Sequence, residues 1–190
     1  ANAAGIVGVA PGAELVGLRA CWQEADMPGR CSSFSLARSL NFAILNGIKI
    51  LNLSLGGPPD PLLEELVISA MKQGTVVVAA WGESNMASFP ASLPGVIAAG
   101  RRKHGGIPAP YIDVISTAPG GRYRFVTGSS VAAAHVSGVV ALMLASRSDL
   151  DAREIARVLS GALMEQEGGP LLDACVALQA VTGEQAACPG

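Results

Sequence analysis

The sequence predicts an α/β fold with three layers, in which helices flank a mainly parallel β-sheet. Half of the 190 residues are hydrophobic, only 15% are charged, and aromatic residues are scarce at 4%. Such a composition suits a buried parallel sheet that packs closely against helices. Strand-like and helix-like segments alternate along the chain, which favours right-handed parallel connections. We interpret residues 1–190 as a single domain, with a core over 1–182 and a tail over 183–190.

The predicted strands are short apolar segments between turn residues. The uninterrupted run Thr75–Ala80 is the clearest, because a strand buried on both faces needs no polar alternation. The others contain alternating or β-branched residues. In chain order the predicted strands are Glu14–Ala20, Ile48–Leu55, Thr75–Ala80, Gly95–Gly100, Tyr111–Ser116 and Tyr123–Val126.

Capping residues and glycines delimit the predicted helices. Asp60 is a typical N-cap and Pro61 suits the first helical position. Asn46-Gly47 and Gly74 are typical helix ends. In chain order the predicted helices run from Ser33 or Ser35 to about Leu45, from Pro61 to about Lys72, from Ser130 to about Ser146, from a cap at Asp149 or Asp151 to about Leu159, and over Leu171–Ala180.

Charge and apolar runs give no sign of nucleic-acid binding or of a membrane span. The net charge is −2, and the one basic cluster, Arg101-Arg102-Lys103, is typical of a solvated loop. The longest apolar run, Val136–Ala145, is interrupted by Ser137 and Gly138, which favours a core helix. The chain opens without a Met or a basic leader, so no signal peptide is recognised.

Known nucleotide, zinc and α/β-hydrolase motifs are absent from the sequence. It contains no G-x-G-x-x-G after a strand, no G-x-x-x-x-G-K-[ST], no G-x-S-x-G and no H-E-x-x-H. The acidic residues form no cluster with metal-ligand spacing. We therefore predict no cofactor and no metal site from the motifs.

The four cysteines fall into two local pairs. Cys21 and Cys31 flank a polar loop, and Cys175 and Cys188 could tie the C-terminal tail to the domain. Two such pairs favour disulfides and an exported protein, periplasmic or secreted. The alternative is four free thiols in a cytoplasmic protein.

Ser130 is the candidate nucleophile. It follows the predicted strand Tyr123–Val126 and stands at the start of a helix rich in small residues. The free N–H groups and the positive dipole end of a helix N-terminus stabilise an oxyanion that forms beside it. This position therefore suits a serine that attacks a carbonyl.

The stretch Gly128–Gly138, GSSVAAAHVSG, resembles the nucleophile motif of the subtilisin-like serine proteases, Gly-Thr-Ser-Met-Ala followed by His-Val-x-Gly. Further matches occur in the family's order along nearly the whole chain. They are Gly5–Ala13, Ile50–Gly57, Phe89–Ile97, Ala109–Gly120 and Asp173–Leu178. The resemblance implies a subtilisin-like fold that is incomplete without an N-terminal segment, because the family's catalytic Asp and His precede the first match.

The resemblance also implies roles for named residues. Ser130 would attack the scissile carbonyl, and its N–H would be one oxyanion donor. Ser54, Leu55 and Gly56 would bind an extended peptide as an added strand. The pocket for the residue before the cleaved bond would be walled by Ala79, Ala80, Trp81 and Gly82. Calcium is the one ion that the resemblance would allow, and the sequence identifies no site for it.

This chain departs from the family pattern at the oxyanion asparagine and at the pocket wall. Glu83 aligns with that asparagine, and a carboxylate would repel an oxyanion unless a shifted loop brought Asn85 into its place. The bulky Trp81 would narrow the pocket, or else pack outward.

Neither histidine of the chain suits the role of the base. His135 follows Ser130 by five residues on the same helix and is expected to be structural, and His104 lies in a glycine-rich loop.

Three functions follow from this interpretation. The leading hypothesis is a serine endopeptidase of peptide or protein substrates, whose Asp and His come from a separate or missing N-terminal fragment of the same protease. The first alternative is a catalytically impaired pseudoprotease that binds peptide segments. The second is a slow processing protease for a single substrate.

Overall fold

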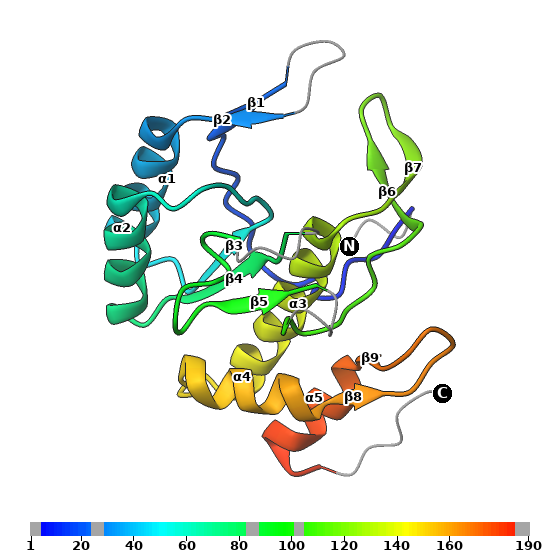
Figure 1. Ribbon diagram of the computed structural model, residues 1–190. Coiled ribbons are helices and arrows are strands. Elements are labelled where there is room, and N and C mark those ends of the chain that lie inside the picture. Colours follow the sequence, from blue (N-terminus) through cyan, green and yellow to red (C-terminus); the bar gives the residue numbers. More distant parts are fainter. Residues whose placement is uncertain (1–4, 24–28, 83–87, 101–104, 185–190) are drawn as a thin grey trace.

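The computed structural model describes residues 5–23, 29–82, 88–100 and 105–184, and it contains a central parallel sheet between two layers of helices (Figure 1). The sheet consists of β3 (Ile50–Leu53), β4 (Val76–Ala80) and β5 (Ile97–Ala99), in the order β3-β4-β5. Both strand pairs are parallel, with Ile50 opposite Val76 and Val78 opposite Ile97. The predicted three-layer α/β class is confirmed.

Alternation along β4 divides the interior into two cores. Val76, Val78 and Ala80 belong to the core shared with helix α3 (Ser129–Ser146). Val77 and Ala79 belong to the core shared with α1 (Ser33–Leu45) and α2 (Pro61–Lys72). Because neighbouring strand residues point to opposite faces, a strand covered on both faces must be apolar throughout.

Hydrogen-bonding side chains begin both helices of the α1–α2 layer. Asp60 accepts hydrogen bonds from the N–H groups of Leu62 and Leu63, so the predicted cap of α2 is confirmed. The cap of α1 is Ser32, whereas we expected Ser33 or Ser35. Ser35 instead completes a capping box with Ser32 and also donates to the Ala20 carbonyl at 2.6 Å, which ties α1 to the chain before it.

Helix α3 is, among the described residues, the one helix long and apolar enough to cross a membrane. Its side chains Ala132, Val136, Val140 and Met143 are fully buried in the core. It packs against all three strands of the sheet and against the last helix, α5 (Ala174–Thr182). We therefore interpret α3 as the core helix of a globular domain.

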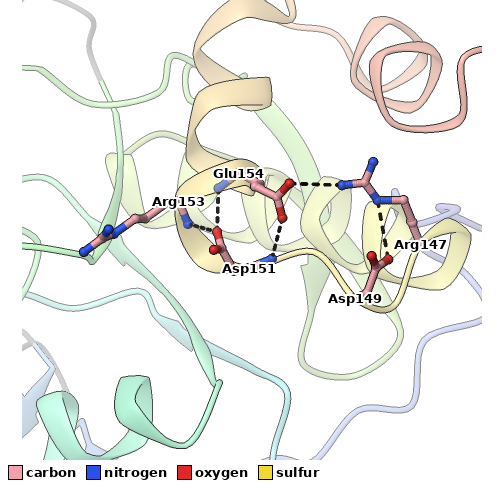
Figure 2. A network of polar contacts seen from close by, with 5 residues as sticks. All are labelled: Arg147, Asp149, Asp151, Arg153 and Glu154. Atoms are coloured by element: carbon pink, nitrogen blue, oxygen red, sulfur yellow. Dashed lines mark hydrogen bonds and ion pairs between the residues drawn. The ribbon is translucent and has the colours of Figure 1, made fainter.

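A polar network links the end of α3 to α4 (Ala152–Gly161), as Figure 2 shows. Arg147 forms ion pairs with Asp149 at 3.5 Å and with Glu154 at 3.3 Å. Asp151 caps α4 in a reciprocal capping box with Glu154. Of the two predicted caps, Asp151 is therefore correct and Asp149 is not.

The segment before α5 differs from the prediction of one helix over Leu171–Ala180. Leu171–Leu172 forms β9, which pairs with β8 (Leu163–Met164) in an antiparallel ribbon. Asp173 then caps α5 by accepting from the Val176 N–H. A short apolar run has no periodicity of its own, so the pairing with β8 decides its conformation.

The predicted strand Glu14–Ala20 is wrong, because this segment is not assigned to any strand. It is largely exposed, with Leu15 at 89% of its full accessibility. Among the described strands β3 pairs only with β4, and no described strand pairs with the segment over 14–20. A strand forms only where a partner completes its hydrogen bonds.

Two antiparallel ribbons complete the fold. The strands β1 (Cys21–Trp22) and β2 (Arg30–Cys31) are joined by the predicted disulfide between Cys21 and Cys31. Cys175 is also disulfide-bonded, while its expected partner Cys188 lies outside the described residues. The strands β6 (Val114–Ala118) and β7 (Arg122–Val126) form a hairpin that leads into α3.

Candidate active site

A shallow pocket of about 200 Å³ lies beyond the ends of β3 and β4, at the start of α3. Carboxyl ends of parallel strands are the usual ligand-binding edge of an α/β sheet. The pocket is lined by Ser54, Leu55, Gly56, Ala80, Gly82, Ser88, Gly128, Ser129 and Ser130. The structure thus brings together the candidate nucleophile and most of the predicted substrate-binding residues.

Ser130 is exposed in the first turn of α3, two residues after the N-cap Gly128. No side chain of the described residues caps this helix, which leaves hydrogen-bond donors of its first turn at the pocket. Gly128 has φ +150°, a conformation that favours glycine, and its N–H donates to the Tyr111 carbonyl at 2.8 Å. The sharp entry into the helix therefore places the exposed Ser130 at the pocket.

The segment after β3 forms the wall opposite Ser130. The Ser54 hydroxyl donates to the Ser130 carbonyl at 2.8 Å, which joins the two sides of the pocket directly. A Cβ at Gly56 would collide with the Ser88 hydroxyl, so only glycine fits there without displacing that side chain. Next to it, the Gly57 N–H donates to the Phe89 carbonyl at 3.0 Å.

The segment that ends β4 contributes only two of its four predicted residues. Ala80 and Gly82 line the pocket. Ala79 is fully buried in the core shared with α1 and α2, and Trp81 packs against that same core. Because side chains alternate across a strand, Ala79 and Trp81 point away from the face that bears the pocket. Trp81 therefore packs against that core and is not among the residues that line this pocket.

Other predicted residues lie apart from the pocket or outside the described residues. Glu83, Asn85 and His104 belong to the latter group. His135 is half-buried on α3, and its Nδ1 lies 3.1 Å from the carbonyl oxygen of Val131 on the preceding turn. This contact is that of a packed helix residue, and His135 does not line the pocket.

Sequence reasoning missed Ser88 as a pocket residue. Ser88 directly precedes Phe89, which forms an antiparallel bridge with Gly57. The fold therefore brings Ser88 beside the segment that follows β3. Only its place immediately before Phe89–Ile97, a segment of the family pattern, could have signalled it. Gly128 and Ser129 also line the pocket, and both belong to the motif around Ser130.

Comparisons with known proteins identify the family. The subtilase family model matches residues 1–115 and 104–173. Subtilisin BL of Lederbergia lenta is 37% identical in an alignment of length 158 that covers 75% of this chain and 57% of that protein. The thermophilic serine proteinase of Bacillus sp. (strain AK1) is 33% identical in an alignment of length 170 that covers 80% of this chain and 41% of that protein. The chain therefore spans about half the length of these relatives.

Solved structures agree with this result. The prenylagaramide maturation protease PagA superposes with a TM-score of 0.70 at 26% identity, covering 85% of this chain and 72% of PagA. Fervidolysin of Fervidobacterium pennivorans, a keratinolytic enzyme, superposes with a TM-score of 0.67 at 25% identity, covering 77% of this chain and 29% of fervidolysin. By its family model, its relatives and its fold, the chain belongs to the subtilase family.

Proposed function

We propose that this chain is the serine-bearing portion of a serine endopeptidase that cleaves peptide bonds through Ser130. One observation carries the proposal: the pocket brings an exposed serine, the first turn of α3 and the open segment Ser54–Gly56 together. Acyl transfer to a serine requires a nucleophile, oxyanion donors and a segment that binds the substrate, and in this proposal these residues supply them.

The substrate in this proposal is an extended peptide or protein segment that lies along Ser54–Gly56. Ser54 and Gly56 are exposed, and Leu55 is half-buried. Among the described residues, their backbone belongs to no strand. An extended peptide can pair with such backbone as an added strand, and Gly56 lets its main chain approach closely.

The general base and its orienting carboxylate come, in this proposal, from a segment N-terminal to residue 1 or from a separate fragment of the same protease. The edge of β3 that pairs with no described strand and the largely exposed segment over 14–20 suit the addition of further strands. The relatives, about twice as long as the matched region, are consistent with such a segment.

In this proposal the reaction proceeds in two stages, acylation and deacylation. The base removes the proton of the Ser130 hydroxyl as its oxygen attacks the scissile carbonyl carbon. The Ser130 N–H donates to the oxyanion that forms. The protonated base gives its proton to the leaving amine, and an acyl-serine ester remains. Water, deprotonated by the same base, attacks this ester, and the protonated base returns the proton to the departing serine oxygen, which releases the carboxylic acid product and restores the Ser130 hydroxyl.

The test compares the complete protein with its Ser130→Ala variant. A fluorogenic peptide assay and covalent labelling with a fluorophosphonate are both expected to detect the unchanged protein and to fail with the variant. Hydrolysis by Ser130→Ala at the unchanged rate would refute the proposal.

A dedicated processing protease is a second candidate. The superposition with PagA, a maturation protease, favours it. Single-turnover kinetics on a panel of unrelated peptides discriminates the two, because a general endopeptidase cleaves many of them and a processing enzyme cleaves one class. Turnover of any peptide also excludes the peptide-binding pseudoprotease.

The structure supports export of the protein, but its described residues offer no support for bound calcium. The Cys21–Cys31 disulfide supports an oxidising compartment, so we infer a periplasmic or secreted protein. Calcium has no such support: the described part of the chain holds no group of three or more His, Cys, Asp or Glu side chains that could bind a metal.

A further inference from the structure

Three polar side chains form a chain of hydrogen bonds between β3 and α3 that ends at Ser130. The Ser137 hydroxyl lies 3.0 Å from Asn52 Oδ1, and Asn52 Nδ2 lies 3.0 Å from the Ser54 hydroxyl. The Ser54 hydroxyl in turn lies 2.8 Å from the Ser130 carbonyl oxygen. We call Ser137, Asn52 and Ser54 the polar relay.

The spacing of these residues explains how they meet. Asn52 and Ser54 are two positions apart at the end of β3, so their side chains share one face of the strand. Ser130 and Ser137 are seven positions apart, which is two turns of α3, so they share one face of the helix. These two faces pack against each other, since α3 contacts β3.

Every hydrogen bond in the polar relay has a defined direction. Ser137 donates to the amide oxygen of Asn52, whose NH₂ group can only donate and therefore donates to Ser54. The Ser54 hydroxyl accepts this hydrogen bond and itself donates one to the Ser130 carbonyl. Donors aligned head to tail in this way strengthen one another.

The polar relay fixes the peptide group that follows Ser130. The oxygen of that peptide group is held by Ser54, and its N–H, which belongs to Val131, donates to the Gly128 carbonyl at 2.9 Å. On the other side of Ser130, the Gly128 N–H is held by Tyr111. Hydrogen bonds thus hold the backbone on both sides of Ser130. They thereby restrain the positions of the Ser130 hydroxyl and of its N–H, the proposed oxyanion donor.

We propose that Asn52 and Ser137 are positioning residues for Ser130: they orient the Ser54 hydroxyl so that it holds the nucleophile's peptide group in its reactive geometry. The inference rests on the proposed function. Neither residue lines the pocket, so neither is expected to bind substrate. Small errors in the position of a nucleophile reduce the rate of the chemical step more than the affinity for substrate.

The experiment uses the complete protein and three variants at these positions. Ser137→Ala removes the first donor, and Ser137→Thr restores a hydroxyl. Asn52→Asp is the sharpest change, because a carboxylate cannot donate: the Ser54 proton turns toward residue 52, and the Ser130 carbonyl loses its donor. Ser146→Ala is the matched control, since Ser146 is another serine on α3 whose hydroxyl donates a hydrogen bond, in its case to the Leu142 carbonyl far from the site.

We expect Asn52→Asp to lower kcat and the rate of fluorophosphonate labelling about 5- to 10-fold, the effect of one hydrogen bond, with KM changed less than twofold. Ser137→Ala is expected to show a smaller loss that Ser137→Thr recovers, and Ser146→Ala none. Unchanged kcat in both Asn52→Asp and Ser137→Ala would overturn the inference, as would equal losses in Ser146→Ala. If Ser130→Ala itself keeps full activity, the proposed function fails instead.

Discussion

Gly138 lies within α3, where the N-terminal segment crosses the helix. A Cβ at this position would lie 2.8 Å from Val9 Cβ and 3.1 Å from Val9 Cγ1. Carbon atoms in contact prefer 3.5–4.0 Å. Because Val9 Cβ is attached to the backbone, the clash is relieved only by moving the segment itself.

Gly138→Ala therefore combines two opposed effects. Alanine is more favourable than glycine within a helix by about 1 kcal/mol. Overpacking typically costs about 1–3 kcal/mol. We expect the variant to lose up to about 2 kcal/mol of unfolding free energy in the complete protein, measured by urea denaturation.

A double-mutant cycle isolates the contact. Val9→Ala leaves a Cβ at position 9 but removes both γ-methyl groups, which gives the segment room to adjust, so Gly138→Ala is expected to cost less in its background, with a coupling of about 1 kcal/mol or more. The matched control is Gly161→Ala at the end of α4, where an added Cβ meets nothing within 4 Å. The control is expected to gain up to about 1 kcal/mol. Equal gains in Gly138→Ala and Gly161→Ala would show that Val9 does not pack against α3.

Three further predictions concern the caps and the disulfide. Hydrogen bonds from the Ser33 hydroxyl and, to a smaller extent, from the Leu63 backbone lower the pKa of Asp60. The ionised Asp60 therefore stabilises the folded protein above the ordinary Asp pKa, and this stabilisation is lost as pH falls through the lowered pKa. Asp60→Asn keeps a capping acceptor and is expected to flatten the acid limb of the stability–pH curve, and an unchanged limb would contradict this role. Asp151→Ala is expected to lower the unfolding free energy by about 1 kcal/mol through the lost capping box, whereas Asp151→Asn should retain most of it in the same urea experiment. Replacing Cys21 and Cys31 with serine opens a loop of sequence separation 10 and is expected to cost about 2–4 kcal/mol of unfolding free energy under oxidising conditions. Under reducing conditions, which also open the bond at Cys175 in both proteins, the difference is expected to vanish, and a difference that persists would show that the bond itself is not responsible.

The sequence predicted best those elements whose signals are local. Asp60 and Pro61 start α2 as expected, and the apolar run of β4 is buried on both faces. Glu14–Ala20 has the pattern of a strand, but a strand also needs a neighbouring strand that completes its backbone hydrogen bonds. The residues of the segment do not reveal whether such a neighbour is present. Leu171–Leu172 shows the converse, because its pairing with β8 outweighs a pattern that also suits a helix.

The residues of the candidate site, like the elements of the fold, were predicted only in part from the sequence. Motif order placed Ser130 and Ser54–Gly56 in one site, and the structure brings them to one pocket. The strand period could have separated Ala80 and Gly82 from Ala79 and Trp81, because residues two apart share a face. Ser88 could not be found in this way, since it reaches the pocket through a pairing between distant segments.

The central claim is that Ser130 is the nucleophile, and active-site labelling tests it most directly. The complete protein is treated with a fluorophosphonate, digested and mapped by mass spectrometry. The account predicts a single phosphonylated residue, Ser130, and no label in Ser130→Ala or in denatured protein. A label on another residue of the active protein, or labelling that persists in Ser130→Ala, would contradict the account.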